Sequence, residues 1–132
     1  MTKNLEIFCV TDKHFKYLDK TKYRLAAVGK KEFPKNYISS DKNINIFHKE
    51  EYYSELTFHY WFWKNELKKS KYKSKWIGFC QKRRFWVKKK EKTFKFNNLL
   101  RKAPTEWQKF ESVICEKIFV DNPKFMKMIK RG

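Results

Sequence analysis

The sequence predicts an α/β protein with a Rossmann-like, mainly parallel sheet flanked by helices. Two short apolar runs, residues 5–10 and 76–80, have the continuous hydrophobic character of strands that are covered on both faces. Between them lies a long aromatic-rich segment, residues 48–67, in which apolar side chains repeat at helical spacing. Strands that alternate with helices are typical of a parallel sheet. We treat residues 1–132 as a single domain.

The first part of the chain predicts two strands and a polar loop. Residues 5–10 form the first strand, and residues 23–28 form a second, weaker one that Gly29 stops. Residues 30–43 are polar and contain Pro34, so we expect them to form a loop.

Residues 48–67 predict one long helix, which Asn45 can cap. Leu56, Tyr60 and Trp63 repeat at helical spacing, so we expect this face to be buried against the sheet. The opposite side is also aromatic, which indicates a helix that is buried on most sides.

The second part of the chain predicts a strand near the centre of the sheet at residues 76–80, because that run is apolar throughout. Residues 97–101 predict a short helical turn. Residues 112–115 predict a fourth strand, and residues 124–130 predict a final helix that begins just after a proline.

The formal net charge of +19 favours polyanionic partners, namely nucleic acid, nucleotides or an anionic membrane face. The alternative is compositional, because lysines scattered over a solvated surface need no ligand to explain them. Cys9, Cys80 and Cys115 lie far apart without metal-ligand spacing, so we expect buried free thiols and no metal site. With no secretory h-region and no membrane-spanning run, we expect a cytoplasmic protein.

Polar loops follow the predicted strands, and ligands of parallel sheets bind at the carboxyl ends of the strands. We therefore expect the loops at residues 11–15, 39–43 and 81–86 to converge there. The candidate ligand-binding side chains in or near these loops are Thr11, Asp12, His14, Asp41, Asn43, Glu55, Arg83 and Arg84.

Each candidate also has a structural alternative. Two adjacent guanidiniums after a strand can neutralise phosphate charge without a metal. Equally, Arg83 or Arg84 can form a buried ion pair with Glu55. Asp41 and Asn43 can serve as turn-forming residues rather than as ligands of sugar hydroxyls.

This chain has ELT at residues 55–57, YWFWKN at 60–65 and IGFCQKRRF at 77–85. These motifs resemble those of the bacterial capsular-polysaccharide glycosyltransferase-like family DUF4422. That family's pattern runs roughly E-L-T, Y-W-x-W-K-N and then I-G-x-x-H-Y-R-R-[YF]. Residues 7–15, IFCVTDKHF, resemble the family's first strand and loop. The likeness covers residues 5–86. This chain departs from the pattern with Gln-Lys in place of His-Tyr and with Asp12 in place of a common His.

The resemblance implies a GT-A-type domain that binds a nucleotide-sugar donor and transfers a hexosyl group to a glycan acceptor. The chain has no D-x-D motif, so metal-independent binding of the diphosphate is the expectation. Family members are longer, which implies that this chain is an incomplete, amino-terminal donor-binding portion. The alternative function is a basic nucleic-acid-binding module, although no motif of that class is present.

Overall fold

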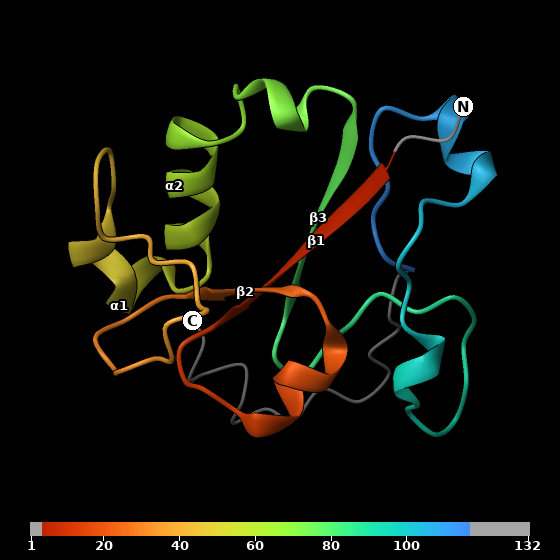
Figure 1. The fold of residues 1–132 in the computed structure, drawn as a ribbon, viewed down its shortest axis with the longest axis horizontal. Coiled ribbons are helices and arrows are strands. Elements are labelled where there is room, and N and C mark those ends of the chain that lie inside the picture. The colour runs from red at the N-terminus through yellow and green to blue at the C-terminus, as the bar shows by residue number, and fades with distance from the viewer. Residues whose placement is uncertain (1–3, 117–132) are drawn as a thin grey trace, which may run out of the picture.

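The computed structural model describes residues 4–116 and contains an all-parallel sheet of three strands. The strands are β1 (Asn4–Thr11), β2 (Arg24–Ala27) and β3 (Lys75–Gln81), in the order β2-β1-β3 (Figure 1). This arrangement confirms the predicted α/β class with a parallel sheet. The described sheet is small and open, as expected for an incomplete Rossmann-like fold.

The strand at the centre of the described sheet is β1, so the prediction that residues 76–80 occupy the centre is wrong. Within the described residues β3 pairs only with β1, in a register that places Val10 opposite Gln81. The apolar run reflects covered faces, which a strand at the edge of a sheet can also have. Trp86 donates its indole N–H to the carbonyl of Phe79 (2.9 Å) and so covers part of this edge.

Two hydrophobic clusters lie on opposite faces of β1, because successive side chains of a strand alternate. Phe8 and Val10 belong to the first cluster, together with residues of helix α2 (Leu56–Asn65). Ile7 and Cys9 belong to the second cluster, which a 3-10 turn at Lys16–Thr21 helps to cover. Figure 1 shows α2 beside one face of the sheet.

The predicted helix at 48–67 is confirmed in position but is broken into pieces. A 3-10 turn at Phe47–Lys49 leads into α1 (Glu50–Tyr53), and α2 follows after Ser54. Ser54 has φ 48° and ψ −122°, which interrupts the helical path. Oδ1 of Asn45 accepts a hydrogen bond from the backbone N–H of Phe47 (3.1 Å), but the N-cap of this first turn is Ile46, so Asn45 precedes the cap rather than forming it.

The face of α2 that we predicted to be buried is the exposed one. Leu56 and Trp63 are 52% and 56% exposed, whereas Phe58, Trp61 and Phe62 are buried. Both faces of this helix carry aromatic side chains, so periodicity alone could not distinguish them. Packing against the sheet determines which face is buried. The ring centroids of Phe62 on α2 and Phe8 on β1 lie 4.9 Å apart.

The remaining described chain contains only 3-10 turns, at Ser70–Tyr72, Phe96–Asn98 and Thr105–Lys109. The predicted turn near residues 97–101 is thus confirmed with shifted bounds. Residues 112–115 form no strand, so that prediction is wrong, and the predicted helix at 124–130 lies outside the described residues.

The thiols of Cys9 and Cys80 are free and buried as expected, but Cys115 is exposed. The predicted strand that would have buried Cys115 is absent. None of the helices in the described part of the chain combines the length and apolar character that crossing a bilayer requires.

Candidate binding site at the carboxyl edge of the sheet

The loops that follow β1 and β3 meet at the carboxyl edge of the sheet, as predicted. Parallel pairing of β1 with β3 brings the carboxyl ends of these strands together. Two side-chain hydrogen bonds then join the loops that follow them. Lys82 donates from Nζ to Oδ1 of Asp12 at 2.5 Å. The hydroxyl of Tyr17 donates to the backbone carbonyl of Lys82 at 2.6 Å. Residues distant in sequence are therefore joined at one end of the sheet.

Asp12 is held as a carboxylate. The hydrogen bond from Lys82 lowers the pKa of Asp12, and the charges of Lys82 and Lys31 add to this effect against a smaller opposing contribution from burial. The carboxylate is thus ionised and already partnered at neutral pH. In this arrangement Asp12 positions Lys82, which sequence analysis did not select as a candidate.

The third loop, residues 39–43, reaches the same edge by way of β2. Ser40 donates its hydroxyl to the carbonyl of Ala27 (3.1 Å), the last residue of β2. Val28 then donates its N–H to the carbonyl of Thr11 (3.0 Å), the last residue of β1. The loops at residues 39–43 and 81–86 are thus each tied to the end of β1, one through Ala27 and Val28 and the other through Lys82.

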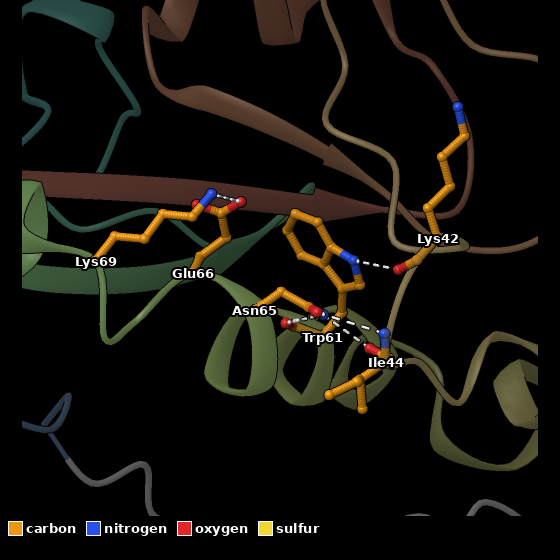
Figure 2. Close-up of polar contacts among 6 residues, drawn as sticks. All are labelled: Lys42, Ile44, Trp61, Asn65, Glu66 and Lys69. Atoms are coloured by element: carbon orange, nitrogen blue, oxygen red, sulfur yellow. Dashed lines mark hydrogen bonds and ion pairs between the residues drawn. The ribbon is translucent and has the colours of Figure 1, made fainter.

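Helix α2 anchors the far end of this third loop (Figure 2). The indole N–H of Trp61 donates to the carbonyl of Lys42 (2.9 Å). Asn65 donates from Nδ2 to the carbonyls of Ile44 (2.8 Å) and Trp61 (2.9 Å). Two residues of the YWFWKN motif therefore hold the loop in place. Just beyond the end of α2, Lys69 and Glu66 form an ion pair (2.9 Å).

Asp41 and Asn43 are exposed and take part in local turn contacts. Asp41 accepts a hydrogen bond from the hydroxyl of Ser39. Asn43 has φ 62°, and its carbonyl accepts from Nδ2 of Asn45 (2.8 Å). The turn-forming role that we kept as an alternative accounts for these contacts, while their exposure leaves both side chains accessible to a ligand.

Thr11 and His14 shape the loop after β1. The buried hydroxyl of Thr11 donates to the carbonyl of Lys13 (2.6 Å) and accepts from its N–H (3.2 Å). Nδ1 of His14 forms a hydrogen bond with the hydroxyl of Tyr37 (2.9 Å). Burial, followed by nearby groups such as Asp19, raises the pKa of Tyr37 to about 12, so the phenol stays protonated at neutral pH.

Arg83 and Arg84 lie in a tight turn rather than at the end of an extended strand. Gln81 and Arg84 exchange backbone hydrogen bonds of 3.3 and 3.2 Å across it. Both arginines are exposed, and neither forms an ion pair with another residue in the 4–116 range. Glu55 instead accepts a hydrogen bond from Nε2 of Gln81 (2.7 Å). The predicted ion pair between Glu55 and an arginine is therefore wrong.

A cavity of about 480 Å³ opens beside this edge. Its lining combines cationic side chains, aromatic rings and part of the third loop, and it includes Gly29, Lys31, Phe33, Tyr37 and Asp41. The residues before 39 were predicted only as a polar loop. Lysine is so frequent in this chain that Lys31 carried no distinguishing signal in the sequence.

A second cavity, of about 420 Å³, lies along β3, and Trp76 and Trp107 are among the residues that line it. Its lining is mostly apolar, and none of the predicted ligand-binding residues contributes to it. A further cavity, of about 590 Å³, has a polar lining at the amino edge that includes Glu6, Lys75 and Arg101, so charged side chains gather at both edges of the sheet. Across residues 4–116, no three His, Cys, Asp or Glu side chains gather in a way that could hold a metal ion. Cationic side chains are the groups the carboxyl edge offers to a phosphate.

Comparisons with curated proteins and with solved structures found no match to this chain. A family model described as "Domain of unknown function (DUF4422)" matches residues 6–128. The match extends well past residues 5–86, in which the motifs lie. It covers nearly the whole chain, and the protein therefore belongs to the DUF4422 family.

Proposed function

We propose that this protein is a glycosyltransferase-like component of surface or capsular polysaccharide synthesis that binds a nucleotide-sugar donor. The observation that carries the proposal is the position of the strand-end loops at the carboxyl edge of a parallel sheet, where Arg83 and Arg84 are exposed and without an acidic partner among the described residues. Ligands of open parallel sheets bind at this edge.

The chemistry of the edge suits a nucleoside diphosphate. Lys31, Arg83 and Arg84 supply positive charge, which can offset the diphosphate charge without a metal. The rings of Phe33 and Tyr37, whose centroids lie 4.9 Å apart, offer the adjoining cavity an aromatic wall for a base. Asp41 is exposed for contact with sugar hydroxyls.

The proposal includes hexosyl transfer to a glycan acceptor in the cytoplasm. The bond between the sugar and the diphosphate breaks, a bond to an acceptor hydroxyl forms, and that hydroxyl loses its proton. We assign the described residues to the donor side of this reaction.

The nucleic-acid alternative has less support from the structure. Proteins that bind single strands present exposed aromatic platforms for base stacking. Here the main aromatic cluster, which includes Phe8, Phe58 and Phe62, is buried under α2. We do not propose a specific nucleic-acid partner.

Calorimetric titration with UDP, GDP and CDP tests the proposal. At least one of these ligands should bind the wild-type protein, and binding should persist in EDTA. Arg83→Met and Arg84→Met should each weaken binding by about 1.5–3 kcal/mol, the range for a hydrogen bond to a charged group. Arg101→Met is the matched control, because Arg101 is exposed near the amino end of the sheet, beside Leu5 and Glu6.

Two outcomes would contradict the proposal: no binding of any nucleoside diphosphate, or equal weakening by Arg101→Met. Loss of binding in EDTA would contradict only its metal-independent part. Gel-shift titration with random DNA and RNA at two salt concentrations is the companion experiment, since tight binding there would favour the nucleic-acid class.

A further inference from the structure

The side of α2 that faces away from the sheet carries an apolar stripe. We call it the outer stripe of α2 and define it as Leu56, Tyr60 and Trp63 of the helix together with Leu67, two residues beyond its end. Leu56, Trp63 and Leu67 are 52%, 56% and 44% exposed. Tyr60 stacks edge-on against Trp63, with ring centroids 5.9 Å apart. Large apolar side chains that are lined up and exposed along one helix mark an interaction surface.

Positive charge accompanies this stripe. Nζ of Lys64 lies 3.8 Å from the centroid of the Trp63 ring and 5.8 Å from that of Tyr60. Residues 64–73 contain five lysines and a single acid, Glu66. Glu66 already pairs with Lys69. The carboxyl-terminal end of α2 is therefore both apolar and strongly cationic.

We propose that the outer stripe of α2 docks the protein on an anionic lipid surface. Helices that lie in a membrane interface combine Trp, Tyr and Leu side chains with flanking lysines. The rings and leucines enter the boundary between headgroups and acyl chains, while the lysines contact acidic headgroups. This arrangement is the charge complement of a bilayer that contains anionic lipid.

Charge also argues against the other occupants of this surface. A second copy of the chain would bring two molecules of net charge +19 together through their lysine-rich ends. Nucleic acid would satisfy the lysines, but it offers nothing apolar to bury Leu56 and Leu67. A bilayer accommodates both the charge and the leucines. The inference does not rest on donor binding, because the stripe lies on α2 and includes none of the proposed donor-binding residues.

Vesicle co-sedimentation tests the proposal with the full chain. The wild-type protein should bind vesicles made of equal parts phosphatidylglycerol and phosphatidylcholine, and it should not bind phosphatidylcholine alone. The double variant Leu56→Ser/Trp63→Ser should bind the mixed vesicles at least about tenfold more weakly, because two large apolar side chains no longer enter the interface. Lys64→Gln/Lys68→Gln should weaken binding by about fivefold for each lysine removed.

Matched control variants distinguish binding through the outer stripe from binding through the general positive charge of the protein. Phe110→Ser removes a ring that is 58% exposed directly after the 3-10 turn at Thr105–Lys109. Lys88→Gln/Lys90→Gln removes two exposed charges outside α2. Both controls should leave vesicle binding within about twofold of wild type, since neither site adjoins the outer stripe. Circular dichroism and thermal unfolding should show that every variant is folded.

Several results would overturn the proposal. The first is equal binding of the Leu56→Ser/Trp63→Ser variant and the wild type. The second is a loss of binding in the controls as large as that in the stripe variants. The third is a concentration-dependent dimer that Trp63→Ser abolishes while no vesicle binds, which would assign the stripe to a second copy. Unchanged nucleotide titration in the stripe variants would keep this test distinct from that of the proposed function.

Discussion

The carboxylate of Asp12 accepts a hydrogen bond from Nζ of Lys82 at 2.5 Å, and this contact joins the loop after the central strand to the turn after the edge strand. The side chains are 49% and 25% exposed, so solvent screens the pair. A double-mutant cycle with Asp12→Ala and Lys82→Met should give a coupling of about 0.2–1 kcal/mol in urea unfolding. A coupling of zero would show that the pairing of β1 with β3, rather than this ion pair, holds the two loops together.

The two faces of α2 should respond to substitution in opposite ways. Phe62 is 2% exposed and packs on Phe8, so Phe62→Ala should lower the free energy of unfolding by about 3–5 kcal/mol. Trp63→Ala removes a side chain that is 56% exposed, and its effect should stay within about 0.5 kcal/mol. Equilibrium unfolding of the two variants compares them directly. A larger loss for Trp63→Ala would mean that the helix is turned the other way.

Asn65 should determine the stability of the loop that contains Ile44. Asn65→Ala deletes three hydrogen bonds, two to the carbonyls of Ile44 and Trp61 and one from the backbone N–H of Ile44 (3.4 Å), and it should cost about 1 kcal/mol because the contacts are partly solvated. The backbone amide of Ile44 should also exchange with solvent faster. Asn97→Ala is the control, since Asn97 is exposed in a 3-10 turn. Equal effects of the two substitutions would contradict the anchoring role.

Gly29 should resist substitution for a backbone reason. Its φ is 84°, which a residue with a side chain adopts only at a cost. Gly29→Ala should therefore destabilise the protein by about 1–2 kcal/mol. An added Cβ would lie 3.4 Å from the carboxyl carbon of Glu50, the mobile end of a side chain. If Glu50→Ala rescued the loss, contact rather than backbone conformation would be the cause.

Glu6 of β1 links all three strands. Its carboxylate accepts hydrogen bonds from Arg24 at the start of β2 (2.6 Å) and from Lys75 at the start of β3 (3.0 Å). Partial burial opposes its ionisation, but the hydrogen bonds from Lys75 and Arg24 prevail and hold the pKa of Glu6 below its usual 4.5. A depressed pKa stabilises the folded state above the ordinary pKa, and this contribution disappears as pH falls through the lowered value.

The urea midpoint of Glu6→Gln should accordingly lie below that of wild type at neutral pH. The difference should shrink steadily as the pH falls below 4.5, the ordinary pKa of the carboxyl. The measurement is a series of unfolding curves across acidic pH for both proteins. A gap that stays constant with pH would show that packing, and not ionisation, is what the substitution changes.

The sequence by itself determined the parallel α/β class, because apolar runs, turn residues and helix signals are local. Residues 5–10 and most of residues 23–28 became strands, and Asn45 accepts a hydrogen bond just before the helical segment that follows. The convergence of the strand-end loops also followed from the sequence. Once strands are parallel, their carboxyl ends must share one edge.

Only the tertiary structure decided which surfaces meet. A helix with aromatic side chains on both faces does not reveal which face is covered, so Trp63 was misplaced and Phe62 was the packing residue. The position of β3 in the sheet depends on which strands pair with it, and the composition of β3 alone does not encode those partners. The partner of Glu55 depended on the tight turn at Gln81, which brought the amide within 2.7 Å and left the arginines exposed. Local patterns specify elements, whereas contacts between distant residues depend on the geometry of the whole chain.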